Sequence, residues 1–174
     1  MEPVLFENNP IAAEDLPKVE DLPEQPLNPV YLKIEYAGTA ILMAFLMIPL
    51  IILPFTDAPG IIAPIGAAVW LFLLILQLVV IRRGFHKKSF SIREKDITYR
   101  SGLIWQEVTT IPFQRIQHCE VIRGPLDQLF GLASLKVYTA GGGSTDLEIP
   151  GLDPEKATQM KDFILNQMVN EGDE

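Results

Sequence analysis

The chain has 174 residues, a formal net charge of −8 at pH 7 and a mean hydropathy of +0.22. Its single cysteine, Cys119, excludes an internal disulfide and a cysteine zinc cluster, and two histidines are too few for a histidine-rich metal site. The net charge hides a segregation, because acidic residues dominate 1–30 whereas basic residues outnumber acidic ones between Arg82 and Arg123. The region that follows the apolar part of the chain is therefore basic, which is the relevant property for its partners.

Residues 1–30 form an acidic, proline-rich segment. Its prolines are Pro3, Pro10, Pro17, Pro23, Pro26 and Pro29. Proline removes backbone donors and fixes φ, and like charges repel one another, so we expect a disordered tail over 1–30. A second, very short tail is expected at 171–174.

Two strongly apolar runs, 36–55 and 61–81, follow the tail and are separated by Thr56-Asp57-Ala58-Pro59-Gly60. Each run has about 20 residues, which at about 1.5 Å per residue span the roughly 30 Å hydrocarbon core of a bilayer. Backbone groups in hydrocarbon must be satisfied within their own segment, so both runs are predicted to be helices. A buried helical pair in a soluble core is the alternative, but such helices normally keep a polar edge. We therefore predict a transmembrane hairpin over 31–83.

A basic cluster follows the second run at once and comprises Arg82, Arg83, Lys87 and Lys88. Basic residues that flank a span mark the cytoplasmic side, whereas the opposite loop carries Asp57 as its one charge. Both termini are therefore expected in the cytoplasm, in a multi-pass protein of the bacterial inner membrane. The same cluster can attract anionic lipid headgroups, at about 1 kcal/mol per basic residue near the surface. These four residues are the candidate site at the membrane interface, as a topology signal, a lipid contact or both.

From Ser89 the pattern changes to short β segments. Strands are predicted at 90–92, 97–100, 105–111, 116–122, 135–139 and 146–149, with a hairpin tip at 141–144. Asp153 and Pro154 then suit the start of a helix. Its apolar face is made of Ala157, Met160, Phe163, Ile164 and Met168, at three- and four-residue spacing. The order predicts one cytoplasmic domain over 84–170, with strands first and an amphipathic helix last.

Four stretches of this domain carry a resemblance to a known family. They are Ile111-Pro112-Phe113-Gln114-Arg115-Ile116, Leu129-Phe130-Gly131-Leu132-Ala133-Ser134-Leu135, Val137-Tyr138-Thr139-Ala140-Gly141 and Ile149-Pro150-Gly151-Leu152. In this order, after a hairpin, they resemble the bacterial pleckstrin-homology-like, membrane-flanked domain family, the YdbS-type membrane proteins. The resemblance covers roughly 34–168. It implies an α+β fold, in which a two-helix transmembrane hairpin precedes a pleckstrin-homology-like split β-barrel of two roughly orthogonal antiparallel sheets capped by the C-terminal helix. It supplies no catalytic residues.

Motifs that carry catalytic chemistry are missing from the sequence. Gly141-Gly142-Gly143 is followed by Ser-Thr-Asp rather than by the ending of a phosphate-binding loop, which indicates a hairpin turn. His118 and Cys119 are neighbours on a predicted strand, so their side chains point to opposite faces and cannot form a nucleophile pair. Cys119 is expected to fill the core. Asp146 and Glu148 share a strand face, which is more typical of a solvated surface than of a cation site.

These patterns predict a non-catalytic, membrane-tethered interaction or assembly module without cofactor or metal. Its expected partners are the lipid bilayer with its anionic lipids, and another membrane protein or a second copy of the chain, but no nucleic acid. The alternative is a sensor of anionic lipid headgroups, in which the basic cluster acts together with Lys95 or Arg100. A transporter or enzyme subunit has less support, because Gln77 is the one strongly polar side chain in either apolar run and is expected to form an interhelical hydrogen bond.

Overall fold

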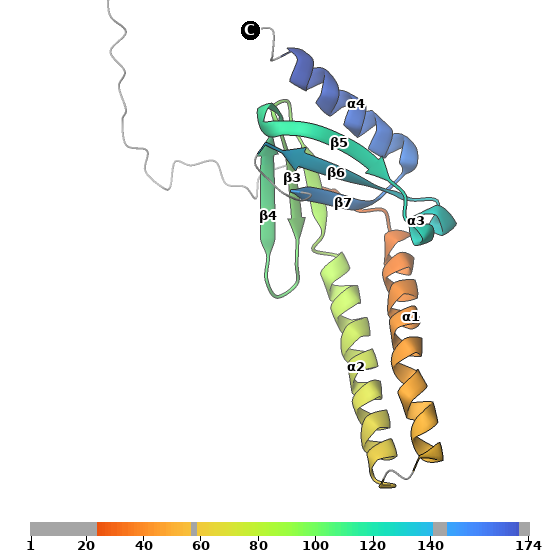
Figure 1. Cartoon of the computed structure of the whole chain (residues 1–174). Coiled ribbons are helices and arrows are strands. Elements are labelled where there is room, and N and C mark those ends of the chain that lie inside the picture. The colour runs from red at the N-terminus through yellow and green to blue at the C-terminus, as the bar shows by residue number, and fades with distance from the viewer. Residues whose placement is uncertain (1–23, 57–58, 141–145, 171–174) are drawn as a thin grey trace, which may run out of the picture.

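The computed structural model describes residues 24–56, 59–140 and 146–170. Two long helices extend from one side of a β-rich domain (Figure 1). The elements in chain order are β1 (Gln25–Pro26), α1 (Tyr31–Ile52), η3 (Leu53–Phe55), α2 (Ile62–Phe85), β2 (Ser89–Ile92), β3 (Asp96–Ser101), β4 (Glu107–Pro112), η4 (Phe113–Arg115), β5 (Ile116–Ile122), α3 (Pro125–Phe130), β6 (Ala133–Thr139), β7 (Leu147–Leu152) and α4 (Pro154–Asn170).

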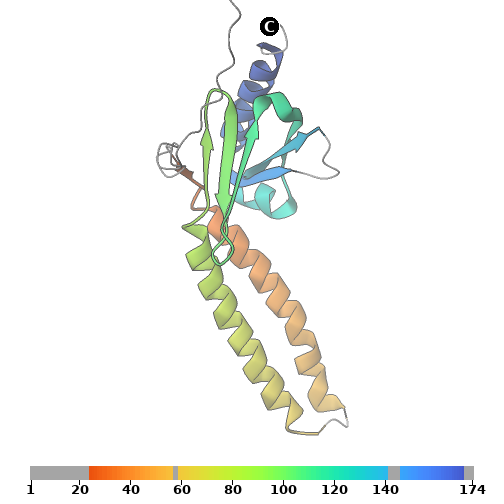
Figure 2. The same ribbon diagram turned by 90° about the vertical axis from the view of Figure 1, so that its left-hand side faces the viewer.

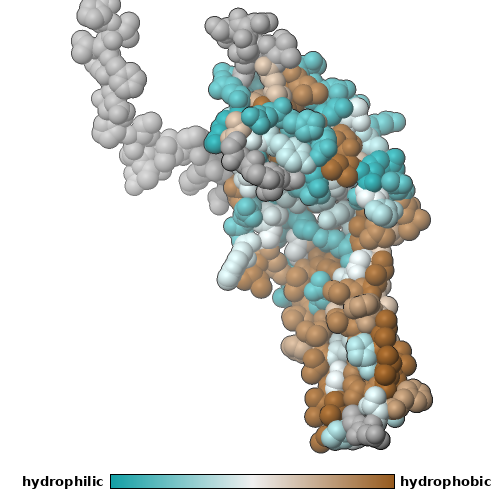
Figure 3. Space-filling model, in the orientation of Figure 1, coloured by the Kyte–Doolittle hydropathy of each residue, from teal (hydrophilic) through white to brown (hydrophobic). Residues whose placement is uncertain are grey.

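The two long helices have the length and composition of membrane spans, over Tyr31–Phe55 and Ile62–Phe85. Only 11% and 6% of their apolar windows are buried inside the molecule, so their side chains face outward rather than into a soluble core. Figure 3 shows the resulting hydrophobic surface along both helices. In water such a surface would be strongly unfavourable, whereas in a bilayer it needs no protein cover.

The helices differ from the predicted runs at their ends near the domain. α1 begins at Tyr31 rather than at 36, and α2 continues to Phe85 rather than ending at 81. The prediction stopped at the charged residues Glu35 and Arg82, but helical hydrogen bonding continues through the interfacial turns, where long charged side chains reach polar surroundings. The hydrogen bond between the helices that was expected from Gln77 comes instead from Trp70, whose Nε1 donates to the Met43 carbonyl at 3.1 Å.

The domain contains two antiparallel sheets. The first has the strand order β1-β2-β3-β4 and the second has the order β5-β6-β7. The strands of the second sheet run across those of the first, and α4 covers the second sheet (Figures 1 and 2). The buried core between these layers consists of Leu27, Phe90, Ile97, Ile111, Phe113, Ile116, Cys119, Ala133, Leu135, Val137, Leu147, Ile149, Leu152, Ala157, Met160 and Ile164. The predicted two-sheet fold with a closing helix is therefore confirmed.

The apolar face of α4 is narrower than its periodicity suggested. Ala157 and Ile164 are fully buried, whereas Phe163 is 38% exposed. The Phe163 ring packs edge-on against Phe113, with ring centroids 6.0 Å apart. Phe163 therefore lies at the margin of the buried face, and Ile164 lies at its centre.

Two predicted boundaries were wrong. Residues 24–30 belong to the domain, because Gln25 and Pro26 pair with Phe90 and Ser89 of β2 and Leu27 is 2% exposed. A tail over 1–30 is therefore too long; residues 1–23, like the predicted tip at 141–144 and the tail at 171–174, lie outside the described residues. Trp105, predicted at the start of a strand, lies in the 102–106 connection between β3 and β4.

Candidate functional site at the membrane junction

The chain passes between hairpin and domain twice, before α1 and after α2, and the first passage is tied to β7. The backbone N–H of Asn28 donates to the Gly151 carbonyl at 3.2 Å, and its side-chain amide donates to Asp153 Oδ1 at 3.0 Å. The side-chain oxygen of Asn28 accepts the backbone N–H of Val30 at 2.9 Å. Asparagine suits this place because its side chain can hydrogen-bond the backbone two residues on. The start of α1 is thereby held against the end of β7.

Gly151 allows α1 to approach β7 closely. Its φ is +67°, a left-handed conformation that favours glycine. A Cβ at this position would lie 2.6 Å from Tyr31 Cβ and 2.7 Å from Tyr31 Cγ. Any other residue at 151 would therefore push the first turn of α1 away from the domain.

The second passage is tied to α1 by Lys88. Its Nζ forms an ion pair with Glu35, and the two side chains are 19% and 18% exposed. The same Nζ lies 5.2 Å from the centroid of the Tyr31 ring, within the range of a cation–π contact. Lys88 therefore joins the two passages to each other, and its charge is already neutralised by Glu35.

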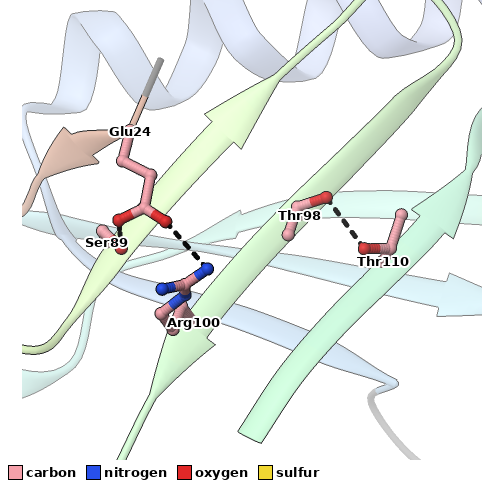
Figure 4. A network of polar contacts seen from close by, with 5 residues as sticks. All are labelled: Glu24, Ser89, Thr98, Arg100 and Thr110. Carbon is pink, nitrogen blue, oxygen red and sulfur yellow. Dashed lines mark hydrogen bonds and ion pairs between the residues drawn. The ribbon is translucent and has the colours of Figure 1, made fainter. Parts of the chain in front are cut away.

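A polar pocket of about 360 Å³ lies beside the second passage. It is lined by Glu24, Pro26, His86, Lys87, Lys88, Ser89, Arg100, Gly102 and Gln106. Figure 4 shows the Glu24 carboxylate within it, accepting a hydrogen bond from Ser89 Oγ at 2.8 Å and pairing with Arg100 Nη2 at 3.1 Å. Arg100 Nε is buried and has no hydrogen-bond partner among the described residues. The pocket therefore already has the chemistry that receives an oxyanion.

The strands beside this pocket are joined by a further polar contact. The Oγ1 atoms of Thr98 and Thr110 lie 2.9 Å apart across β3 and β4 (Figure 4). Tyr99, on the same strand as Arg100, is a neutral phenol: burial raises its pKa to about 12, and the Glu35 carboxylate adds to the rise. Neither group offers a charge to a ligand at neutral pH.

The four predicted interface residues do not form one uniform cluster. Arg82 and Arg83 are exposed in the last turn of α2, and Lys87 is exposed at the rim of the pocket. Lys88 is withdrawn into its ion pair with Glu35, whereas the other three side chains are exposed.

Of the two residues proposed to assist the cluster, the structure brings Arg100 to it and keeps Lys95 away. Lys95 precedes β3 and Arg100 lies near the other end of that strand. At about 3.3 Å per residue the two backbone positions are roughly 16 Å apart. Lys95 therefore lies at the end of the domain remote from the hairpin.

Other residues considered for chemistry have structural roles. His118 is exposed and Cys119 is 5% exposed, on opposite faces of β5 as predicted. Burial raises the pKa of the Cys119 thiol to about 11, which disfavours the nucleophilic thiolate. Asp146 accepts the backbone N–H and the hydroxyl of Thr139 at 2.6 and 2.8 Å, and these bonds hold its pKa below the usual range. Within the described ranges, no three His, Cys, Asp or Glu side chains group as ligands for a metal ion.

Sequence reasoning missed Glu24, Glu35 and Ser89. Glu35 had a usable signal, because it is an acid just before the first apolar run, as Lys88 is a base just after the second. In an antiparallel hairpin these two ends lie at the same depth, so the pair follows from the topology. Glu24 and Ser89 had no such signal, since their meeting depends on the pairing of β1 with β2.

Two known proteins are similar to parts of this chain. The transmembrane protein YdbS of Bacillus subtilis (strain 168) is 32% identical over 104 residues, which are 59% of this chain and 64% of that protein. The chain thus spans slightly less than two thirds of that relative's length. A crystal structure of a DUF1696 family protein with a pleckstrin-homology domain, from Shewanella loihica PV-4, is 16% identical and has a TM-score of 0.39 over 48% of this chain and 73% of that one.

The family assignment depends on a match to most of the chain. The model of the bacterial PH domain family matches residues 30–168, which include both long helices, the strands β2 to β7 and nearly all of α4. That span agrees with the roughly 34–168 that the four sequence stretches indicated. With two apolar helices followed by two antiparallel sheets and a closing helix, this transmembrane protein belongs to the bacterial PH domain family.

Proposed function

We propose that the protein is a non-catalytic, membrane-tethered interaction module that presents its PH domain to another membrane protein. The observation that carries this proposal is the double attachment of the domain to the hairpin, through Gly151 against Tyr31 and through Lys88 paired with Glu35. A domain held in one orientation at a bilayer loses less rotational freedom when it binds a partner in the same membrane. Confinement to the membrane also raises the effective concentration of the two proteins.

The domain has a groove suited to such a partner beside α4. This groove has a volume of about 290 Å³ and runs between α4 and β2. Its lining is Gln25, Phe90, Ile92, Lys156, Gln159, Met160 and Phe163. Lys156 donates to Gln25 Oε1 at 2.8 Å and lies over the Phe90 ring at 5.0 Å, so the floor is apolar and the rim is polar. A groove of this kind fits a cytoplasmic segment of a neighbouring membrane protein.

Photo-crosslinking of the full chain in its native membrane tests the proposal. A photoreactive amino acid at Gln159, on the groove, should give a discrete adduct with a second membrane protein after illumination. The same residue at Gln117, which is exposed on β5, is the matched control and should give none. An adduct of twice the chain mass would identify the partner as a second copy. Labelling of lipid alone at both positions would overturn the proposal.

The proposed location is the bacterial inner membrane, with both termini in the cytoplasm. Arg82 and Arg83 at the end of α2 support this orientation, because basic residues are retained on the cytoplasmic side. Reporter fusions in the 56–60 connection and after residue 174 distinguish the two orientations. A periplasmic signal from the C-terminal fusion would contradict the proposed topology.

The pocket at the membrane junction favours a second candidate function, a sensor of anionic lipid headgroups. Ser89 and Arg100 hold the Glu24 carboxylate there, and a headgroup phosphate in its place would meet the same donors, with Lys87 at the rim. The interaction module predicts instead that anionic lipids are held by screened charge alone, through Arg82 and Arg83.

Native mass spectrometry of the full chain, released from bilayers of mixed lipids, separates the two functions. For the module, lipid retention should fall with added salt, show little preference among headgroups of equal charge and be unchanged by Arg100→Gln. For the sensor, retention should be headgroup-selective, be lost in Arg100→Gln and rise in Glu24→Gln. The full chain is required because residues 24–31 complete the domain.

A further inference from the structure

The connection between β3 and β4 has an unusual composition for a hairpin tip. It reads Gly102-Leu103-Ile104-Trp105-Gln106 and carries no charge. Ile104 is 82% exposed and Trp105 is 72% exposed, although both are large and apolar. Tips that project into water are normally built from Gly, Pro, Asn, Asp and Ser. The turn itself needs Gly102, whose φ is +99° and whose Cβ, if present, would lie 1.8 Å from the Trp105 carbonyl oxygen.

The tip reaches the level of the membrane helices. Figures 1 and 2 show it extending past the end of α2 that joins the domain. A Cβ at Gly84 would lie 3.9 Å from Leu103 Cβ, so the tip touches the last turn of α2. A cavity of about 270 Å³ between tip and helices is lined by Glu35, Gln77, Val80, Ile81, Gly84, Phe85, Lys88, Gly102 and Leu103.

The position of the bilayer follows from the hairpin. About 20 residues at about 1.5 Å each cross a roughly 30 Å hydrocarbon core, so a core that begins at Ile61 ends close to Ile81. Leu103 lines a cavity together with Ile81, which places the tip at this boundary. Tryptophan prefers such a boundary because its ring is apolar and its N–H can still reach water or headgroups.

A second apolar projection lies beside α1. Helix α3 packs against α1 close to the domain, as Figure 1 shows. Its Leu129 is 75% exposed, while Leu132, just beyond this helix, is buried in the domain. The hydrophobic surface of the hairpin is thus flanked by one exposed apolar projection next to each helix.

We propose that the β3–β4 tip, through Ile104 and Trp105, and α3, through Leu129, are inserted into the boundary between headgroups and acyl chains of the bilayer that holds the hairpin. The occupant of these surfaces is lipid, because the tip touches the last turn of α2 beside Ile81 and α3 contacts α1, so both adjoin the apolar surface of the hairpin. Each fully buried side chain of this size contributes roughly as much as a core residue does, so the two contacts would hold the domain against the membrane from both sides of the hairpin.

Fluorescence quenching in proteoliposomes of the full chain tests this inference. Subtracting the signal of Trp105→Phe from that of the wild type isolates Trp105 from Trp70. Phospholipids brominated near the headgroup end of their acyl chains should quench Trp105 more than those brominated near the chain end, and aqueous iodide should have little effect. Leu129→Trp in the Trp105→Phe background should behave in the same way. Phe163→Trp in that background is the matched control on α4; after subtraction of the Trp105→Phe signal, it should be quenched by iodide and not by lipid.

Every other outcome contradicts the proposal. Quenching of Trp105 by iodide to the same extent as at position 163 would place the tip in water. Protection from both iodide and brominated lipid would place it in a contact with protein, either a second copy or another membrane protein. Lipid quenching at Trp105 but not at position 129 would refute the second projection.

Discussion

The end of the domain closed by α4 and the end joined to the membrane are stabilised in different ways. At the closed end, Ala157 and Ile164 of α4 are buried against the sheets in a continuous apolar core. At the membrane end, the contacts are individual pairs between distant residues, such as Lys88 with Glu35, 53 residues apart, and Asn28 with Asp153, 125 residues apart. The first region depends on the area that it buries, and the second depends on complementary partners.

This difference determines how each region responds to substitution. In the core, a truncation removes buried apolar surface and leaves a cavity. The loss of stability is therefore larger when the exposed fraction of the side chain is smaller. At the junction, removing one partner leaves the other without compensation, so a single change can be worse than a double one. Substitutions in the two regions test this contrast.

The centre and the margin of the α4 face should differ strongly. Ile164→Ala should lower the free energy of unfolding by about 2–5 kcal/mol, and Ile164→Asp should prevent folding of the domain because it adds an unpaired buried charge. Phe163→Asp should be milder, since that side chain is 38% exposed and its new carboxylate can reach water. Limited proteolysis of the full chain in detergent measures both. Equal sensitivity of the two variants would mean that α4 packs in another register.

At the junction, Gly151→Ala should weaken the attachment of α1 to the domain. The left-handed backbone at 151 costs about 1–3 kcal/mol for a residue with a Cβ, and that Cβ would also collide with Tyr31. Thermal unfolding of the full chain measures the loss. The companion variant Tyr31→Gly removes both the Cβ and the ring atoms that would collide, so the double variant should lose less than the sum of the two single variants. Additive losses would show that glycine is needed at 151 for the left-handed backbone conformation alone and not for the close contact with α1.

The losses of stability caused by substitutions at Glu35 and Lys88 should not add. Glu35→Gln or Lys88→Met alone should lower stability by about 1–2 kcal/mol, a value below that of a fully buried pair because both side chains are about one-fifth exposed. The double variant should be more stable than either single variant, since no uncompensated charge remains. A double-mutant cycle by chemical unfolding in detergent measures the coupling. A coupling near zero would mean that the pair contributes nothing to the junction.

The smallest expected effect is on the stability of the protein at alkaline pH, through the buried thiol of Cys119. Burial raises the pKa of Cys119 from its ordinary 9.0 to about 11, so folding favours the protonated thiol. The resulting stabilisation is fully present below pH 9.0 and is lost as the pH rises toward about 11. Cys119→Ala should therefore flatten the decline of stability across that interval. Tyr99→Phe is the control, because Tyr99 titrates from 10.0 to about 12 and its removal should flatten the decline at higher pH.

The sequence alone determined the elements whose signal is local. The absence of charge over 36–55 and 61–81 indicates membrane helices, because a bilayer imposes its thickness on any segment that crosses it. The alternation along β6 and β7 and the spacing of Ala157, Met160 and Ile164 reflect burial of one face against a neighbour. The order of these elements predicted one domain of strands closed by a helix, the resemblance to the bacterial pleckstrin-homology-like family implied its two-sheet fold, and Cys119 could be assigned to the core.

The way in which the hairpin and the domain meet depends on long-range contacts of the folded chain. Gly151 is left-handed because β7 turns beneath Tyr31, and Glu24 reaches Arg100 because β1 joins the edge of the first sheet. Lys88 appears in the sequence as one of four similar basic residues, yet the fold neutralises it with Glu35 and leaves Arg82, Arg83 and Lys87 exposed. Such contacts join residues far apart along the chain. Local periodicity does not predict them, because each contact depends on a single complementary partner rather than on a repeated pattern.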